Sequence, residues 1–220
     1  DQMINLLKFI FGTNNLNVQF PSDYSDQLIL DNYAKIIENA LSISSSEIKS
    51  EYLKETGKKR VEETKKLITT KKIKNLPSVF FNSIEVRSDA LKAFFLDNLD
   101  YVRKVVSRKS NRSYRKNKDK KGLETYTKLI FGKDPAIIHL DLYFDPIDDK
   151  STSLIEQVST ILSKYSDVTQ VILHPTATSK PFSSQLVRLI LAVKNIDISK
   201  GISFIYWLCI HKKELLSNMN

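Results

Sequence analysis

The residues with the most chemical potential follow one another along and after a predicted strand at 136–144. They are His139, Asp141, Asp145, Asp148 and Asp149. Alternate residues of a strand point the same way, and carboxylates near a strand end can hold a divalent cation. Asp141 and Asp145 are therefore weak candidates for the metal ligands of a nuclease. Short acids in this position are also ordinary turn and helix-start residues, and we favour that structural interpretation.

Other catalytic patterns are missing from the sequence. The three histidines, His139, His174 and His211, are widely separated, and we predict structural roles for them. The five glycines form no phosphate-binding loop, and no serine lies in a Gly-x-Ser-x-Gly elbow. The single cysteine, Cys209, excludes an internal disulfide, a two-cysteine redox motif and a cysteine-based zinc site. We predict no catalytic residue, no metal and no cofactor, and whether the chain is part of an enzyme stays open.

The net charge of +9 is concentrated in one stretch. Residues 103–121 hold ten of the 34 basic residues and a single acid, Asp119, so the remainder of the chain is neutral. The candidate binding residues there are Arg108, Lys109, Arg112, Tyr114, Arg115 and Lys116. Cations that neutralise phosphates and a tyrosine that stacks on a base predict salt-sensitive nucleic-acid binding. The structural alternative is a solvated insertion, because this composition cannot bury enough apolar surface to order itself.

The sequence pattern in the first half of the chain predicts helices followed by a hairpin. Hydrophobic spacing predicts helices at 3–11 and 26–42, and Ser44-x-x-Glu47 predicts a capping box at the start of a third that runs to about Thr69. Gly57 weakens this third helix, so two helices are an alternative. Leu76–Val86 predicts a strand that turns at Asn82-Ser83, with a helix at 88–106 after it.

The sequence pattern in the second half of the chain predicts a β-α-β unit. It predicts strands at 136–144 and 168–173, joined by a helix at 153–165 that Ser153-x-x-Glu156 would cap. A helix from Pro181 to Ile196 and a strand at Ile202–Ile210 complete the expected elements. No apolar run reaches the length of about 20 residues that a membrane helix needs, so we expect no membrane contact. The chain begins at Asp1 rather than at methionine, as expected for a mature or excised piece.

Two segments resemble a known family. Leu76–Ser83 is similar to the step in thioredoxin-like folds where a proline precedes a central strand that turns into a hairpin. Leu140–Pro146 with Val171–Thr176 resembles the UDP-glucose:glycoprotein glucosyltransferase family, where a strand ending in Asp-Pro leads through a helix to a strand ending in proline. The predicted elements and the charged stretch give an α/β fold, and the resemblance makes it thioredoxin-like with a helical insertion, followed by a β-α-β half. The expected organisation is a helical and thioredoxin-like segment at 1–106, a basic flexible linker at 107–122 and an α/β segment at 123–220.

The resemblance implies a function in glycoprotein quality control. The chain would be a non-catalytic, redox-inactive recognition segment that binds misfolded glycoproteins in the lumen of the endoplasmic reticulum. The family's catalytic residues lie in a different domain, and none can be placed on this sequence. Asn111-Arg112-Ser113 is a glycosylation sequon, which matters only in a secretory compartment. The alternative is a cytoplasmic or nuclear module whose basic segment binds nucleic acid or an acidic partner.

Overall fold

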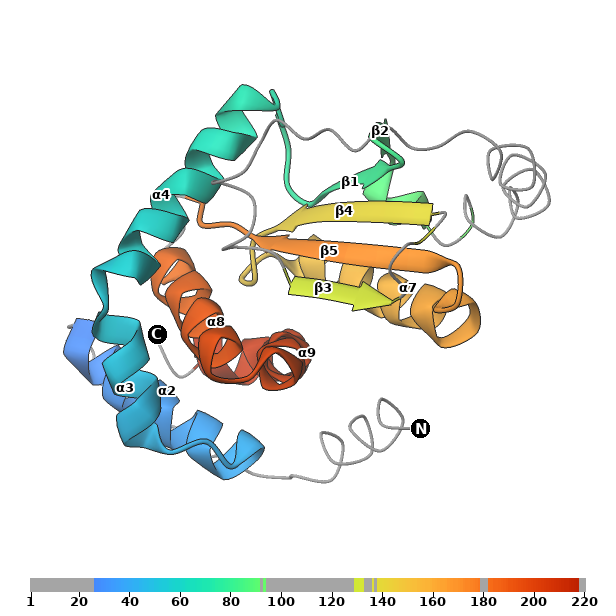
Figure 1. Ribbon diagram of the computed structural model, residues 1–220. Coiled ribbons are helices and arrows are strands. Elements are labelled where there is room, and N and C mark those ends of the chain that lie inside the picture. The colour runs from blue at the N-terminus through green and yellow to red at the C-terminus, as the bar shows by residue number, and fades with distance from the viewer. Residues whose placement is uncertain are drawn as a thin grey trace. The chain divides into compact units, whose positions relative to one another are not determined.

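The chain folds as an α/β protein with several helices and a five-stranded mixed sheet (Figure 1), as the sequence predicted. The computed structural model describes residues 26–91, 93, 129–132, 136, 138–178 and 182–217. The chain divides into two compact units, one formed by residues 1–65 and 176–220 and the other by residues 66–175. The predicted helix at 3–11 and the basic linker at 107–122 lie outside the described residues.

The sheet belongs to the unit formed by residues 66–175. Its strands are β1 (Ser78–Phe81), β2 (Ile84–Val86), β3 (Leu129–Gly132), β4 (Ile138–Phe144) and β5 (Thr169–Pro175). Their spatial order is β2-β1-β4-β5-β3, in which β4 and β5 are parallel and all other neighbours are antiparallel. Helix α7 (Asp149–Tyr165) connects the parallel pair and lies along one face of the sheet (Figure 1). The predicted β-α-β unit is confirmed as β4, α7 and β5. Strand β3 was not predicted from the sequence.

The predicted hairpin is confirmed as β1 and β2. Asn82 and Ser83 have φ angles of 46° and 72°, the left-handed pair that a tight two-residue hairpin turn requires. The Asn82 amide also extends the sheet, because its Oδ1 accepts a hydrogen bond of 2.9 Å from the backbone N–H of His139. The Leu76–Pro77 peptide bond is cis. Because β1 pairs with β4, strands from the predicted segments 1–106 and 123–220 share one sheet.

The capping box predicted at Ser153 is wrong, whereas Ser44 is the N-cap residue that was predicted but lacks the capping hydrogen bond. Helix α7 begins at Asp149, and Asp148 is its cap, with Oδ1 accepting a hydrogen bond of 3.0 Å from the N–H of Lys150. Ser153 therefore lies inside the helix, because the turn after Asp145 brings an aspartate to the cap position first. Ser44 precedes helix α3 (Ser45–Leu53) but makes no capping hydrogen bond, since its Oγ pairs with the Ser46 hydroxyl at 2.8 Å.

The second unit is helical. It contains α2 (Asp26–Leu41), α3, the first part of α4 (Glu55–Thr70), α8 (Ser183–Ile196) and α9 (Ile198–Ser217). The helix predicted from Ser44 to Thr69 is two helices, and the break falls at Lys54 rather than at Gly57. Pairs such as α3 with α8 and α8 with α9 pack together, and one small core cluster joins Val61, Ala177, Val187 and Leu191. The helix predicted at 88–106 begins with a 3-10 turn at Ser88–Ala90, and most of it lies outside the described residues.

The strand predicted at Ile202–Ile210 is wrong, because this segment lies within helix α9. Asp197 caps the helix: its Oδ1 accepts hydrogen bonds from the N–H of Ser199 at 2.8 Å and of Lys200 at 3.3 Å. Residues 203–209 of this helix are all buried, so the sequence shows no helical period of polar residues there, and a short apolar run does not distinguish a buried strand from part of a buried helix. No helix in the described part of the chain is long and apolar enough to cross a bilayer.

An added methyl group should change the free energy of unfolding in opposite directions at two helical glycines, Gly57 and Gly201. A Cβ at Gly201 would lie 2.8 Å from Cα of Lys194, whereas a Cβ at Gly57 would approach nothing closer than 3.8 Å. We expect Gly201→Ala to lower the free energy of unfolding by about 1–3 kcal/mol, because α8 and α9 must separate. Gly57→Ala is the matched control and should raise it by up to about 1 kcal/mol. Urea unfolding measures both, and a stabilising Gly201→Ala would contradict the close approach.

The cap of α9 predicts a pH dependence. Hydrogen bonding by Ser199 holds the pKa of Asp197 below its ordinary value of 3.8. A lowered folded-state pKa contributes stability above the unfolded value, and this contribution is lost as the pH falls through the folded value. We expect Asp197→Ala to lower the free energy of unfolding by about 1 kcal/mol at pH 7 and by less at pH 3. Asp197→Ser retains a hydroxyl cap without a titrating group, so it should show no such change in the acid range.

Candidate functional site

Polar side chains gather on one face of the sheet, across its two parallel strands. Asp141 Oδ1 on β4 lies 2.9 Å from His174 Nε2 on β5. Tyr143 pairs directly with His174 in the register of these strands, which places Asp141 diagonally opposite the histidine. Alternation along β4 directs Asp141 and Tyr143 to this face, while Leu140 and Leu142 are buried on the other. The structure therefore brings together two residues that are 33 positions apart.

Aromatic rings extend the cluster toward β1. The rings of Tyr143 and His174 are stacked, with centroids 4.3 Å apart and planes inclined by 5°. Phe80 of β1 stands edge-on to Tyr143 at 5.8 Å, and Lys71 Nζ lies 5.3 Å from the centroid of the Tyr143 ring. These distances are typical of favourable aromatic and cation–π contacts. The cluster thus runs from a lysine through three rings to a carboxylate.

The Asp141–His174 pair is better suited to structure than to catalysis. A carboxylate that orients an imidazole is the supporting half of a catalytic triad. His174, however, is only 2% exposed, so a substrate has no direct access to its ring. Asp145 lies in the turn after β4, where its Oδ1 accepts a hydrogen bond of 2.9 Å from the N–H of Ile147. Within the described ranges no three His, Cys, Asp or Glu side chains lie close enough to hold a metal ion.

The remaining predicted residues fall elsewhere. Arg108, Lys109, Arg112, Tyr114, Arg115, Lys116 and the sequon residue Asn111 lie outside the described residues. His211 lies on α9, where its Nδ1 is 3.0 Å from the backbone oxygen of Trp207 and its ring stacks on that tryptophan. Cys209 is buried on the same helix. Sequence reasoning missed Lys71, Phe80 and Tyr143 as members of the cluster, although the alternation along 136–144 already placed Tyr143 beside Asp141.

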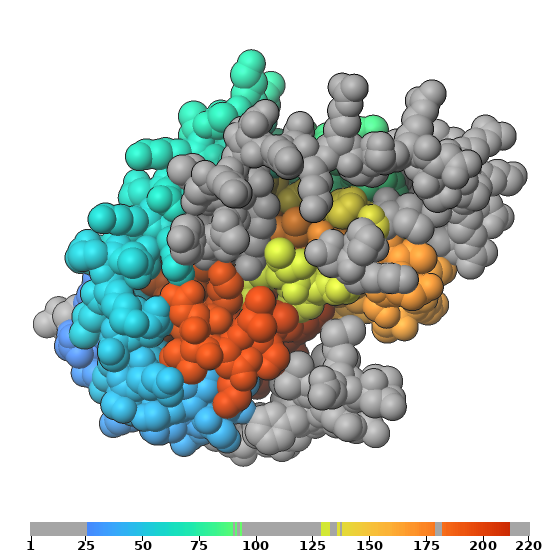
Figure 2. Space-filling model, viewed as in Figure 1, coloured from blue at the N-terminus to red at the C-terminus, as the bar shows by residue number. Residues whose placement is uncertain are grey.

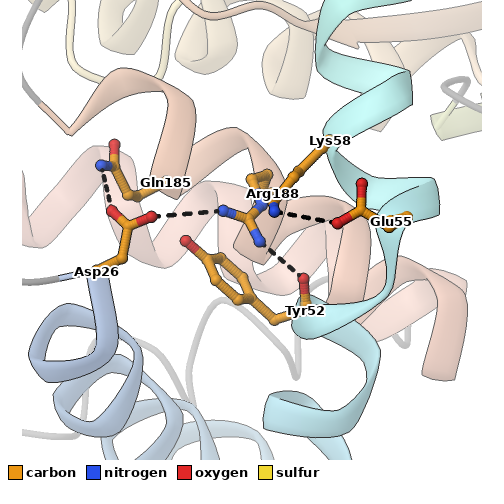
Figure 3. A network of polar contacts seen from close by, with 6 residues as sticks. All are labelled: Asp26, Tyr52, Glu55, Lys58, Gln185 and Arg188. Atoms are coloured by element: carbon orange, nitrogen blue, oxygen red, sulfur yellow. Dashed lines mark hydrogen bonds and ion pairs between the residues drawn. The ribbon is translucent and has the colours of Figure 1, made fainter.

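A second polar cluster lies in the helical unit, around Arg188 of α8 (Figure 3). Its Nη2 donates a hydrogen bond of 3.0 Å to the backbone oxygen of Tyr52, and its guanidinium lies 3.8 Å above the Tyr52 ring. Nη1 lies 3.8 Å from Asp26, whose other carboxylate oxygen accepts a hydrogen bond from Gln185 at 2.9 Å. Arg188 is 7% exposed and ties α2, α3 and α8 together, as a buried cation with several partners does.

A double-mutant cycle tests the Asp141–His174 contact. We expect Asp141→Ala to lower the free energy of unfolding by about 1–3 kcal/mol, because it removes a hydrogen-bonding partner of the buried imidazole. The pair should show a coupling energy of about 1 kcal/mol or more when Asp141→Ala is combined with His174→Ala. Asp89→Ala breaks an exposed ion pair with Arg87 and serves as the control, with an effect below about 1 kcal/mol. Strictly additive losses at Asp141 and His174 would contradict the contact.

Comparison with known proteins identifies no relative of this chain. No protein family, curated protein or solved structure shows a significant match to this chain. Its function is therefore inferred from its own residues and contacts.

Proposed function

We propose that the chain is a non-catalytic, redox-inactive, thioredoxin-like recognition segment of a large glycoprotein glucosyltransferase, which binds misfolded glycoproteins. One observation carries the proposal: the hairpin β1–β2, which Pro77 precedes, lies antiparallel beside a parallel β4-α7-β5 unit in a single sheet. A thioredoxin-like core combines the same two parts. Here the hairpin comes first along the chain, so the proposal implies a circularly permuted order of that core.

The cysteine content supports a role without redox chemistry. Thioredoxin-like enzymes need two neighbouring cysteines, and this sequence has one. Cys209 is buried on α9, in the helical unit rather than at a strand end of the sheet. The polar cluster at Asp141 and His174 is centred on a buried imidazole, to which a substrate has no direct access.

The outer strands of the sheet offer surfaces for an unfolded chain. The large apolar side chains of Ile84 on β2 and Ile130 on β3 are 69% and 44% exposed. Among the described strands, β2 and β3 are the two edge strands of the sheet. An extended segment can add to a strand at the edge of a sheet, with main-chain hydrogen bonds giving affinity and alternate side chains giving selectivity. Misfolded proteins present apolar extended segments of this kind.

Binding to one glycoprotein in two states tests the proposal. Ribonuclease B, reduced and alkylated, should bind the chain, and the native form of the same protein should not. We expect Ile84→Lys to weaken binding about tenfold, because a lysine replaces the apolar contact at the edge of β2. Ile198→Lys, at a 49% exposed position of the helical unit, is the matched control and should leave binding unchanged. Equal affinity for native and unfolded protein would refute the proposed recognition.

The proposal also predicts a location. In isolated microsomes, the tagged full-length protein should be protected from added protease, and its mobility should increase on glycan removal. Asn111→Gln should abolish this mobility difference, because the residue is the acceptor of the sequon 111–113. Digestion without a mobility difference would exclude the lumen and favour the alternative, a cytoplasmic or nuclear nucleic-acid-binding module acting through residues 103–121.

A further inference from the structure

We propose a second interaction surface, for single-stranded nucleic acid, on the last turns of α4 and the segment that joins α4 to β1. Its four cations form what we call the lysine surface, composed of Lys66, Lys71, Lys72 and Lys74. All four side chains are exposed, and Figure 2 shows the teal side chains of this region standing out from the molecule. The surface goes beyond the proposed recognition of glycoproteins and involves different residues from the basic stretch at 103–121.

The lysine surface has no acid within its own segment, although Glu85 of β2 and Asp141 of β4 pair with Phe80 in the strand register. No aspartate or glutamate occurs between Thr64 and Ile84, and no lysine of the surface forms an ion pair with a residue that the structure describes. Earlier lysines of α4 behave differently, since Lys58 and Lys65 pair with Glu55 and Glu62 at 3.1 and 3.0 Å. Unpaired cations close together on one segment attract a polyanion through release of its counterions.

The backbone at Lys72 is left-handed, a conformation that residues with a Cβ adopt infrequently. Lys72 has a φ angle of 57° and ends α4: its N–H bonds to Thr69 O at 3.1 Å, and the next N–H, of Ile73, bonds back to Ile68 O at 3.0 Å. This is the helix-ending motif whose left-handed position is usually glycine, because any Cβ is disfavoured there. A residue that breaks a local preference is expected at functional positions.

An aromatic ring beside the lysines favours nucleic acid over an acidic protein. Lys71 Nζ lies 5.9 Å from the centroid of Phe80, whose side chain is half-buried. The ring of Phe80 is held edge-on against Tyr143, which stacks in turn on His174. A fixed, partly exposed ring next to a cation can stack on a base while the cation contacts a phosphate, and every base offers such a face. An acidic peptide would use the charges and gain nothing from the ring.

Fluorescence anisotropy with a labelled twelve-nucleotide oligouridylate tests the surface. If all four lysines contact phosphates, affinity should fall roughly fifty-fold between 50 and 200 mM salt. Replacing the four by glutamine should remove most of the affinity and most of this salt dependence. The control variant K35Q/K54Q/K58Q/K59Q loses the same charge from exposed lysines of the helical unit and should bind almost as the wild type does. Equal losses in the two variants would overturn the site and indicate only a response to net charge.

Lys72→Gly separates binding from folding. The variant should unfold at a higher urea concentration, because glycine suits the left-handed position, yet bind the oligonucleotide several-fold more weakly, because one phosphate contact is lost. Ser42→Gly is the matched control, since Ser42 follows α2 with a φ angle of 53° and should raise stability without changing affinity. Unchanged oligonucleotide binding by Lys72→Gly would overturn the role of this lysine.

Phe80→Leu decides between the two kinds of polyanion. It should weaken oligouridylate binding about tenfold by removing one stacked base. Binding of polyglutamate should be weaker than binding of the oligonucleotide and insensitive to this substitution. If polyglutamate binds as tightly and Phe80→Leu changes neither affinity, the partner is an acidic protein and the nucleic-acid assignment is wrong. These affinities can be measured whether or not the chain binds unfolded glycoproteins, and oligonucleotide binding at this surface would favour a cytoplasmic or nuclear location over the lumen.

Discussion

The parallel pairing of β4 and β5 is the constraint on which the sheet depends. Parallel neighbours cannot be joined by a tight turn. The chain therefore leaves the sheet after β4, forms α7 and returns as β5, which pairs with β4. This pairing places Leu140, Leu142 and Leu173 in the buried interior, where they are at most 2% exposed. The hairpin β1–β2 then adds to the free edge of β4, and β3 adds to the free edge of β5. The hairpin and β3 therefore lie on either side of the central β4–β5 pair.

The same pairing creates the polar cluster. Asp141 and His174 meet because a specific register aligns Tyr143 with His174, and a slip by one residue would move every side chain to the opposite face. The contact joins the two parallel strands through side chains as well as through the main chain. The burial of His174 explains why a pair of residues that resembles part of a catalytic triad has a structural role here. The rings stacked on it in turn fix the orientation of Phe80 at the edge of the lysine surface.

Much of the fold follows from local sequence patterns, and the errors have physical causes. Alternation predicted β4, and Asn-Ser after an aromatic strand predicted the hairpin. Helix α9 was mistaken for a strand because burial on all sides removes the helical period of polar residues. Strand β3 has only four residues, and it ends at Gly132, where a Cβ would lie 1.9 Å from the backbone oxygen of Thr169. Such a close approach depends on β5 and has no local signal.

The candidate sites were less predictable than the fold. Strand alternation could place Asp141 and Tyr143 on one face, but only the register across β5 brings His174 to them. The lysines at the end of α4 were overlooked because the chain outside residues 103–121 is neutral as a whole, and this balance hides a local excess of lysines. The proposed role of these lysines in binding nucleic acid rests on local features. These are an acid-free segment, a left-handed backbone at Lys72 and the ring of Phe80 beside Lys71.

Native-state amide hydrogen exchange tests most directly whether the β4–β5 pair holds the sheet together. The amides of β4 and β5 should exchange slowest in the unit formed by residues 66–175, at a rate set by its complete unfolding, while those of β2 and of the segment after α4 exchange earlier through local opening. If the amides of β4 exchanged as fast as those of β2, the parallel pair would not be the stable centre of the sheet, and the outer strands would contribute to its stability as much as the central ones do.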